Sequence, residues 1–139
     1  MTSYPDGVSA AAQTAVAIVL LLAGAALLVV ACLGASGRLK RNRFAGVRSP
    51  ATMASAEAFA LGNRVAAPPM LGAALLLLLA GGAFFALAGA AKPVVIVLGL
   101  LGAAVLMVVG GLLGNRAASG CARERCVDCT GCALMESRS

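Results

Sequence analysis

Four cysteines near the C-terminus have spacing that could bind a metal. Two-residue intervals let thiolates converge on one centre, as in zinc sites and iron–sulfur clusters. A four-cysteine zinc site usually has a longer loop between its pairs, and iron–sulfur clusters generally take a distant fourth ligand. Three interpretations stay open: a Zn or Fe–S site, a flexible tail without a ligand, and redox pairing of the thiols. The four cysteines form the pattern C-x4-C-x2-C-x2-C and are Cys121, Cys126, Cys129 and Cys132.

The second group with chemical potential is basic. Arg43 and Arg48 can each form bidentate contacts with a phosphate or a carboxylate. The segment therefore predicts anchoring on anionic lipid headgroups or docking of an acidic partner. Its only acid is Glu57, which we expect to pair with Arg48 or Arg64. Of the 11 lysines and arginines in the chain, those in the segment from Arg38 to Pro68 are Arg38, Lys40, Arg41, Arg43, Arg48 and Arg64.

The same segment carries residues that shape the backbone. Gly46 permits a tight bend. Ser49 precedes Pro50, which favours an extended chain at that point. Thr52 is a suitable N-cap for a short helix, predicted over Met53 to Val65 and lying in the membrane interface. The sequence thus predicts a structured connector.

Residues needed for catalysis are missing from the connector. The chain has no histidine, and the connector has no nucleophile beside a base. We therefore predict that the protein is not an enzyme. Nucleic acid is not the expected partner either, because the connector is short and has a single aromatic residue among its basic residues.

The elements that must position these groups are membrane spans. Apolar residues make up 61% of the 139 and charged residues only 12%, whereas soluble domains are about half apolar and a quarter charged. Three uncharged stretches exceed the roughly 20 residues that cross a bilayer, and helices are the only short segments that satisfy their own backbone in lipid. The predicted fold class is an all-α integral membrane protein with three transmembrane helices. The predicted segments are an N-terminus (1–10), helices (11–34, 69–91 and 93–114), the connector (35–68) and a tail (115–139).

Charge placement predicts orientation. The N-terminal residues carry Asp6 and no lysine or arginine, while the connector and tail are basic. Because basic loops stay inside, we expect a cytoplasmic connector and C-terminus and an outside N-terminus. Reducing conditions there favour metal or redox chemistry over structural disulfides in the tail. Lys92 and Pro93 are expected to form a tight outer turn.

A lipoprotein-like box, Val29-Val30-Ala31-Cys32, ends the first apolar stretch. A secretory signal needs a basic start and a shorter apolar core, and this chain starts with an acidic segment. Lipidation of Cys32 is therefore disfavoured, and we expect a small packing residue there.

Small residues at four-residue intervals predict close helix packing. We expect the small faces of the second and third spans to meet in an antiparallel hairpin, with homo-oligomer formation as the alternative. The absence of charge inside the spans argues against an ion-coupled transporter. The predicted small faces are Gly82, Ala86 and Ala90 on the second span, and Gly99 with Ala103 and Gly110 with Gly114 on the third.

The connector resembles the signature of the SdpI family of small bacterial membrane proteins. That signature is approximately N-R-W/F-x-G-I/V-R-T/S-P-x-T-L/M, then S-x-E-x-W/F, then H/N-R/K. Phe59 stands where tryptophan is common, and Asn63 where histidine is common. The matching residues run from Asn42 to Met53 (Asn42, Arg43, Phe44, Gly46, Val47, Arg48, Ser49, Pro50, Thr52 and Met53) and continue with Ser55, Glu57, Phe59, Asn63 and Arg64.

The resemblance implies a role like that of the founding member, which confers immunity to a secreted peptide toxin and holds a transcriptional repressor at the membrane. We therefore expect peptide-toxin immunity or membrane signalling in a bacterial plasma membrane, with a protein partner bound through the connector. The alternative is a small accessory subunit of a larger bacterial membrane complex, for example a respiratory one. The expected binding residues are Asn42, Arg43, Gly46, Arg48, Pro50, Thr52, Glu57 and Arg64.

Overall fold

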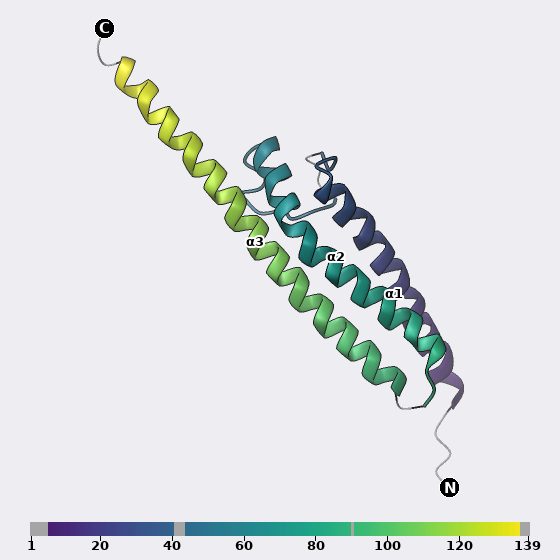
Figure 1. Cartoon of the computed structure of the whole chain (residues 1–139). Helices are drawn as coiled ribbons and strands as arrows, with labels where there is room; N and C mark the ends of the chain where they lie inside the picture. Colours follow the sequence, from purple (N-terminus) through teal and green to yellow (C-terminus); the bar gives the residue numbers. More distant parts are fainter. Residues whose placement is uncertain (1–5, 41–43, 90, 137–139) are drawn as a thin grey trace. The chain divides into compact units, whose positions relative to one another are not determined.

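The computed structural model describes residues 6–40, 44–89 and 91–136, and their side chains at 11–40, 44–89 and 91–120. In these residues the chain forms three helices and no strand: α1 (Asp6–Ala35), α2 (Ala56–Ala86) and α3 (Ala91–Glu136) (Figure 1). Each has a stretch long and apolar enough to cross a membrane. The predicted all-α class with three spans is confirmed.

The short interfacial helix is not confirmed as a separate element. Its last ten residues, 56–65, are the first turns of α2, which continues to Ala86. Thr52 is not the N-cap. Ser55 caps α2, because its Oγ accepts a hydrogen bond of 3.0 Å from the backbone N–H of Ala58.

Two consecutive prolines lie inside α2. Neither Pro68 nor Pro69 has an N–H, so the carbonyls of Arg64 and Val65 have no donor four residues on. The helix nevertheless continues through both. The sequence predicts that the connector ends and the second span begins at residues 68 and 69, but the structure has one continuous helix there.

The turn between α2 and α3 lies earlier than expected. α2 ends at Ala86 and α3 begins at Ala91, so Lys92 and Pro93 belong to the first turn of α3. Proline is favoured there, since the first N–H groups of a helix have no intrahelical acceptor. The reversal uses Gly89, whose φ of 63° is a conformation that glycine adopts easily.

The chain divides into two compact units. The hairpin unit comprises Met1–Val29 and Pro69–Val108, and the connector unit comprises Val30–Pro68 and Val109–Ser139. The core of the hairpin unit combines large and small apolar side chains from all three helices: Leu20, Ala73, Leu77, Ala80 and Ala103.

The small-residue prediction is half right. Gly99 and Ala103 are buried, and a Cβ placed on Gly99 would meet the Cβ of Ala80 on α2. The face of α2 is wrong at Gly82 and Ala86, which are exposed, and a Cβ placed on Gly82 would have no neighbour within 4 Å. Ala90, the third residue of that face, lies outside the described residues. Ala80, two residues before Gly82, supplies the contact instead.

Cys32 lies within α1, three residues from its end. Its side chain is exposed, so it does not pack between helices as we expected.

Candidate functional site: the folded connector

The connector begins with a defined helix end. Gly37 has a φ of 68°, and the N–H of Arg38 donates to the carbonyl of Leu33 at 3.1 Å. The N–H of Gly37 donates to the carbonyl of Gly34, also at 3.1 Å. These two bonds form a Schellman motif, which satisfies the last carbonyls of α1. The backbone therefore has a defined conformation where α1 ends and the basic residues begin.

Ser49 and Thr52 close a tight turn over Pro50. The N–H of Ser49 donates to Thr52 Oγ1 at 2.7 Å, and the N–H of Thr52 donates to Ser49 Oγ at 3.1 Å. The Thr52 hydroxyl also donates to the carbonyl of Ser49 at 3.1 Å. Thr52 is completely buried, so its hydroxyl needs these partners.

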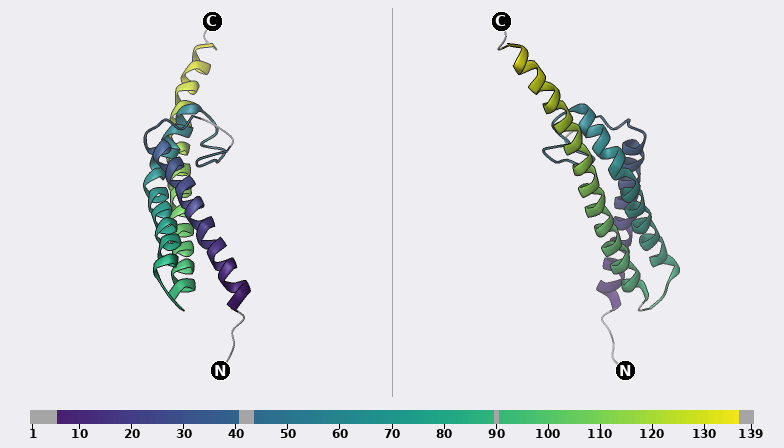
Figure 2. Two further views of the ribbon diagram at one scale, coloured as in Figure 1. Left: turned by 90° about the vertical axis from the view of Figure 1, so that its right-hand side faces the viewer. Right: turned by 60° about the vertical axis from the view of Figure 1, so that its left-hand side comes forward.

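Asn63 joins the part of the connector that precedes α2 to the first turns of that helix. Its Oδ1 accepts a hydrogen bond of 2.6 Å from the N–H of Val47, and its Nδ2 donates to the carbonyl of Phe59 at 2.8 Å. Its side chain is 2% exposed. Because a buried amide loses water on both sides, the two bonds hold the connector in one place along α2. Figure 2 shows the connector beside the first turns of α2.

Gly46 makes this attachment possible. Its φ of 94° is a conformation that disfavours any residue with a side chain. A Cβ there would also meet Asn63 Oδ1, the acceptor for Val47. The predicted bend thus has a second function, which is to let the backbone approach Asn63.

A second close approach joins three segments of the connector unit. A Cβ on Gly62 of α2 would lie 2.8 Å from Thr52 Cγ2 and 3.0 Å from the carbonyl oxygen of Gly114 on α3. A Cβ on Gly114 would lie 2.6 Å from the carbonyl oxygen of Gly62. Glycine at both positions lets the two backbones touch while the Thr52 methyl fills the third side.

The six predicted binding residues that the structure describes divide into two groups. Gly46 and Thr52 lie at the attachment just described. Arg48, Pro50, Glu57 and Arg64 are exposed. Asn42 and Arg43 lie outside the described residues.

The hydrogen-bonded connector therefore carries charged and aromatic side chains on its surface. Phe44, next to the basic cluster in sequence, is 93% exposed. Arg38 and Lys40 are exposed as well. An exposed aromatic ring among cations can bind lipid headgroups or an acidic partner.

The binding prediction omitted the residues that build the scaffold. Asn63, Ser49 and Gly62 carry its contacts, and Ser55 begins the helix that bears two of them. Two signals were available. The family signature contains Asn63, Ser49 and Ser55, and Asn63 is a lone amide on a stretch rich in alanine, a position where a polar side chain needs a buried partner. Its partner Val47 is 16 residues away, and local sequence patterns do not predict that distance.

The cysteine tail belongs to α3, whose backbone is helical to Glu136. A helix rises about 1.5 Å per residue, so Cys121 and Cys132 are about 16 Å apart along this axis. Among the residues with described side chains, no three His, Cys, Asp or Glu residues are grouped to hold a metal, and the four cysteines lie outside those.

Three long apolar helices with a structured basic connector define an integral membrane protein. A family comparison matches residues 38–110 to the SdpI/YfhL protein family, which covers more than half of the chain. The chain belongs to this family, which is not a known enzyme family. No curated protein and no solved structure matches it.

Proposed function

We propose that the protein is a non-enzymatic SdpI-like protein of a bacterial plasma membrane, which acts in peptide-toxin immunity or in membrane signalling. Its connector would bind an acidic partner. One observation carries this proposal: the connector is folded through Asn63 and Thr52, while its charged residues Arg48 and Arg64 are exposed. A linker that only joined two spans would not need a buried amide.

The proposed orientation follows from the basic connector. With the connector in the cytoplasm, its cations lie beside anionic headgroups, and each contributes about 1 kcal/mol of attraction. A cysteine-reactive, membrane-impermeant label tests this orientation on a chain with Val47→Cys and its native cysteines replaced by serine. Intact cells should leave position 47 unlabelled, and opened membranes should label it. Labelling in intact cells would contradict the cytoplasmic connector.

Immunity predicts a growth phenotype. Cells that lack the protein should become sensitive to medium conditioned by bacteria that secrete antimicrobial peptides, and the wild-type chain should restore growth. Arg48→Ala should fail to restore it, because the variant loses a cation that can bind an acidic group through two hydrogen bonds. Arg116→Ala, which removes an exposed arginine from α3, is the matched control and should rescue fully.

The result must be read at equal protein levels in the membrane. Rescue by Arg48→Ala would contradict a role for the connector in immunity. The accessory-subunit alternative instead predicts that the chain co-purifies in fixed proportion with one large complex in mild detergent.

A further inference from the structure

The hairpin unit contains a cavity that the proposed function does not use. It has a volume of about 230 Å³ and is lined by residues of all three helices. An apolar cavity of roughly 150 Å³ already admits benzene, so this one has room for a segment of hydrocarbon chain. Residues that line it include Ala12, Gln13, Val16, Phe84, Lys92 and Ile96.

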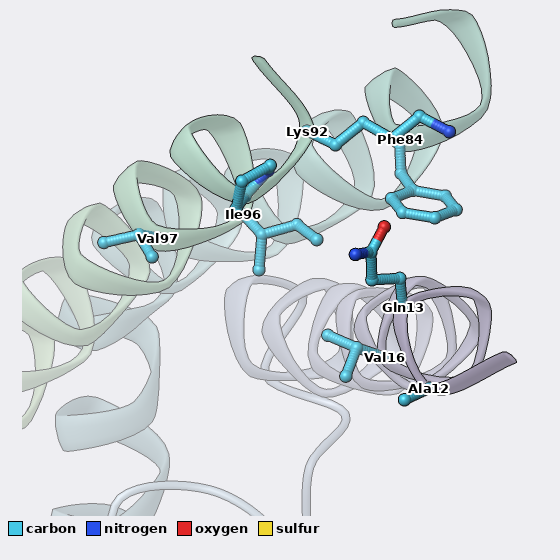
Figure 3. Close-up of a pocket in the computed structure, with 8 residues that line it drawn as sticks. Ala12, Gln13, Val16, Phe84, Lys92, Ile96 and Val97 are labelled. Atoms are coloured by element: carbon cyan, nitrogen blue, oxygen red, sulfur yellow. The ribbon is translucent and has the colours of Figure 1, made fainter. Parts of the chain in front are cut away.

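Its walls are almost entirely apolar. Figure 3 shows Ile96 of α3 pointing toward α1, and the amide of Gln13 pointing toward the ring of Phe84. Val16 and Val97 form part of the lining and are 43% and 51% exposed, so the cavity opens to the outside of the helices. In a membrane protein, an apolar opening on this surface is accessible to acyl chains.

Lys92 is the only charged residue among the described residues that line the cavity. Its Nζ lies 4.5 Å from the centroid of the Phe84 ring, which accepts the cation on its face. Phe84 is itself held edge-on by Phe85, with ring centroids 5.3 Å apart and planes at 88°. The ammonium is therefore positioned at an apolar cavity, where a ring compensates only part of its lost hydration.

We propose that this cavity binds one anionic phospholipid. The acyl chain occupies the space between Val16 and Ile96, and the phosphate contacts the ammonium of Lys92. Apolar volume and a single cation in the same cavity match an amphiphile with one negative headgroup. Neither feature alone would distinguish it from an ordinary lipid contact.

The test is native mass spectrometry of the full chain in detergent, supplied with equal amounts of phosphatidylglycerol and phosphatidylcholine that carry the same acyl chains. The wild-type chain should retain one phosphatidylglycerol with a preference of about fivefold, as one basic contact implies. Lys92→Gln should reduce the preference to near one. Arg116→Gln, a matched loss of charge in the connector unit, should leave it unchanged.

The cavity itself is tested by filling it. Ile96→Trp should remove the retained lipid of either headgroup, and Ala12→Leu provides a second filling variant on another helix if Ile96→Trp fails to fold. Circular dichroism checks helix content in both. A fivefold preference that survives Lys92→Gln, or a bound lipid that survives both filled cavities, would overturn the proposal. So would retention of neither lipid by the wild-type chain.

Discussion

The hairpin unit and the connector unit both bring helices close together through glycine, but Gly102 of the first and Gly114 of the second face different atoms. In the hairpin unit a Cβ on Gly102 would meet the end of one leucine side chain, Leu76. In the connector unit a Cβ on Gly114 would meet a backbone carbonyl. A leucine can change rotamer, whereas a carbonyl moves only with its helix.

Polar contacts show the same contrast. The connector unit has a buried amide and a buried hydroxyl that join segments far apart in sequence. The core cluster of the hairpin unit consists of apolar side chains alone. The hairpin unit therefore tolerates exchange of one apolar residue for another, while the connector unit depends on particular atoms. Two pairs of substitutions test this difference, and a third pair tests the start of α2 within the connector unit.

The largest effect is expected at the backbone contact. Gly114→Ala should lower the free energy of unfolding by about 3 kcal/mol, because the new methyl group forces α2 and α3 apart. Gly102→Ala in the hairpin unit is the matched control and should lower it by less than about 1 kcal/mol, since Leu76 can move. Titration with sodium dodecyl sulfate in mixed micelles, followed by circular dichroism, measures both. Equal losses would remove the distinction between the units.

A smaller effect is expected at the buried amide. Asn63→Leu keeps the size of the side chain but leaves the N–H of Val47 without its acceptor, so stability should fall by about 2 kcal/mol. Gln13→Leu removes an exposed amide from the hairpin unit and should change stability by less than about 0.5 kcal/mol. The same titration compares them. A neutral Asn63→Leu would show that the connector does not depend on this side chain.

The smallest effect is expected at the start of α2. Ser55→Ala removes the N-cap bond to Ala58 and should lower stability by about 1 kcal/mol. Ser119→Ala also removes a hydroxyl, but that hydroxyl donates to the carbonyl of Asn115 on the exposed surface of α3. Its loss should be close to neutral. If both serines behave alike in thermal unfolding, the cap is not what defines the start of the helix.

The fold was predictable because long uncharged apolar stretches leave the backbone no alternative to helix. Their boundaries were less predictable. Ser55 and Thr52 are both good caps by type, and their contacts in the fold decide between them. Thr52 accepts a hydrogen bond from the backbone N–H of Ser49 and is buried against Gly62. The choice of Gly82 failed for a related reason. In a helix rich in glycine and alanine, several faces are small enough to pack closely, so the position of the neighbouring helix decides which one does.

The candidate site was predictable in its location and not in its construction. The arginines and Gly46 were identifiable from residue type, since guanidinium groups bind anions and glycine permits the bend. The attachment through Asn63 depends on a bond between residues 47 and 63, which no local pattern encodes. The sequence therefore predicted the exposed residues that a partner could contact better than it predicted the buried residues that position them.

The paired prolines of α2 have a consequence for how the molecule opens. Pro68 and Pro69 remove two consecutive backbone hydrogen bonds from α2. Unfolding that starts at Ala56 should therefore stop at the prolines. Amides 57–64 should then exchange with deuterium at a rate of their own, separate from that of the bilayer-length segment beyond the prolines. The connector can then loosen and close again while the spans stay protected.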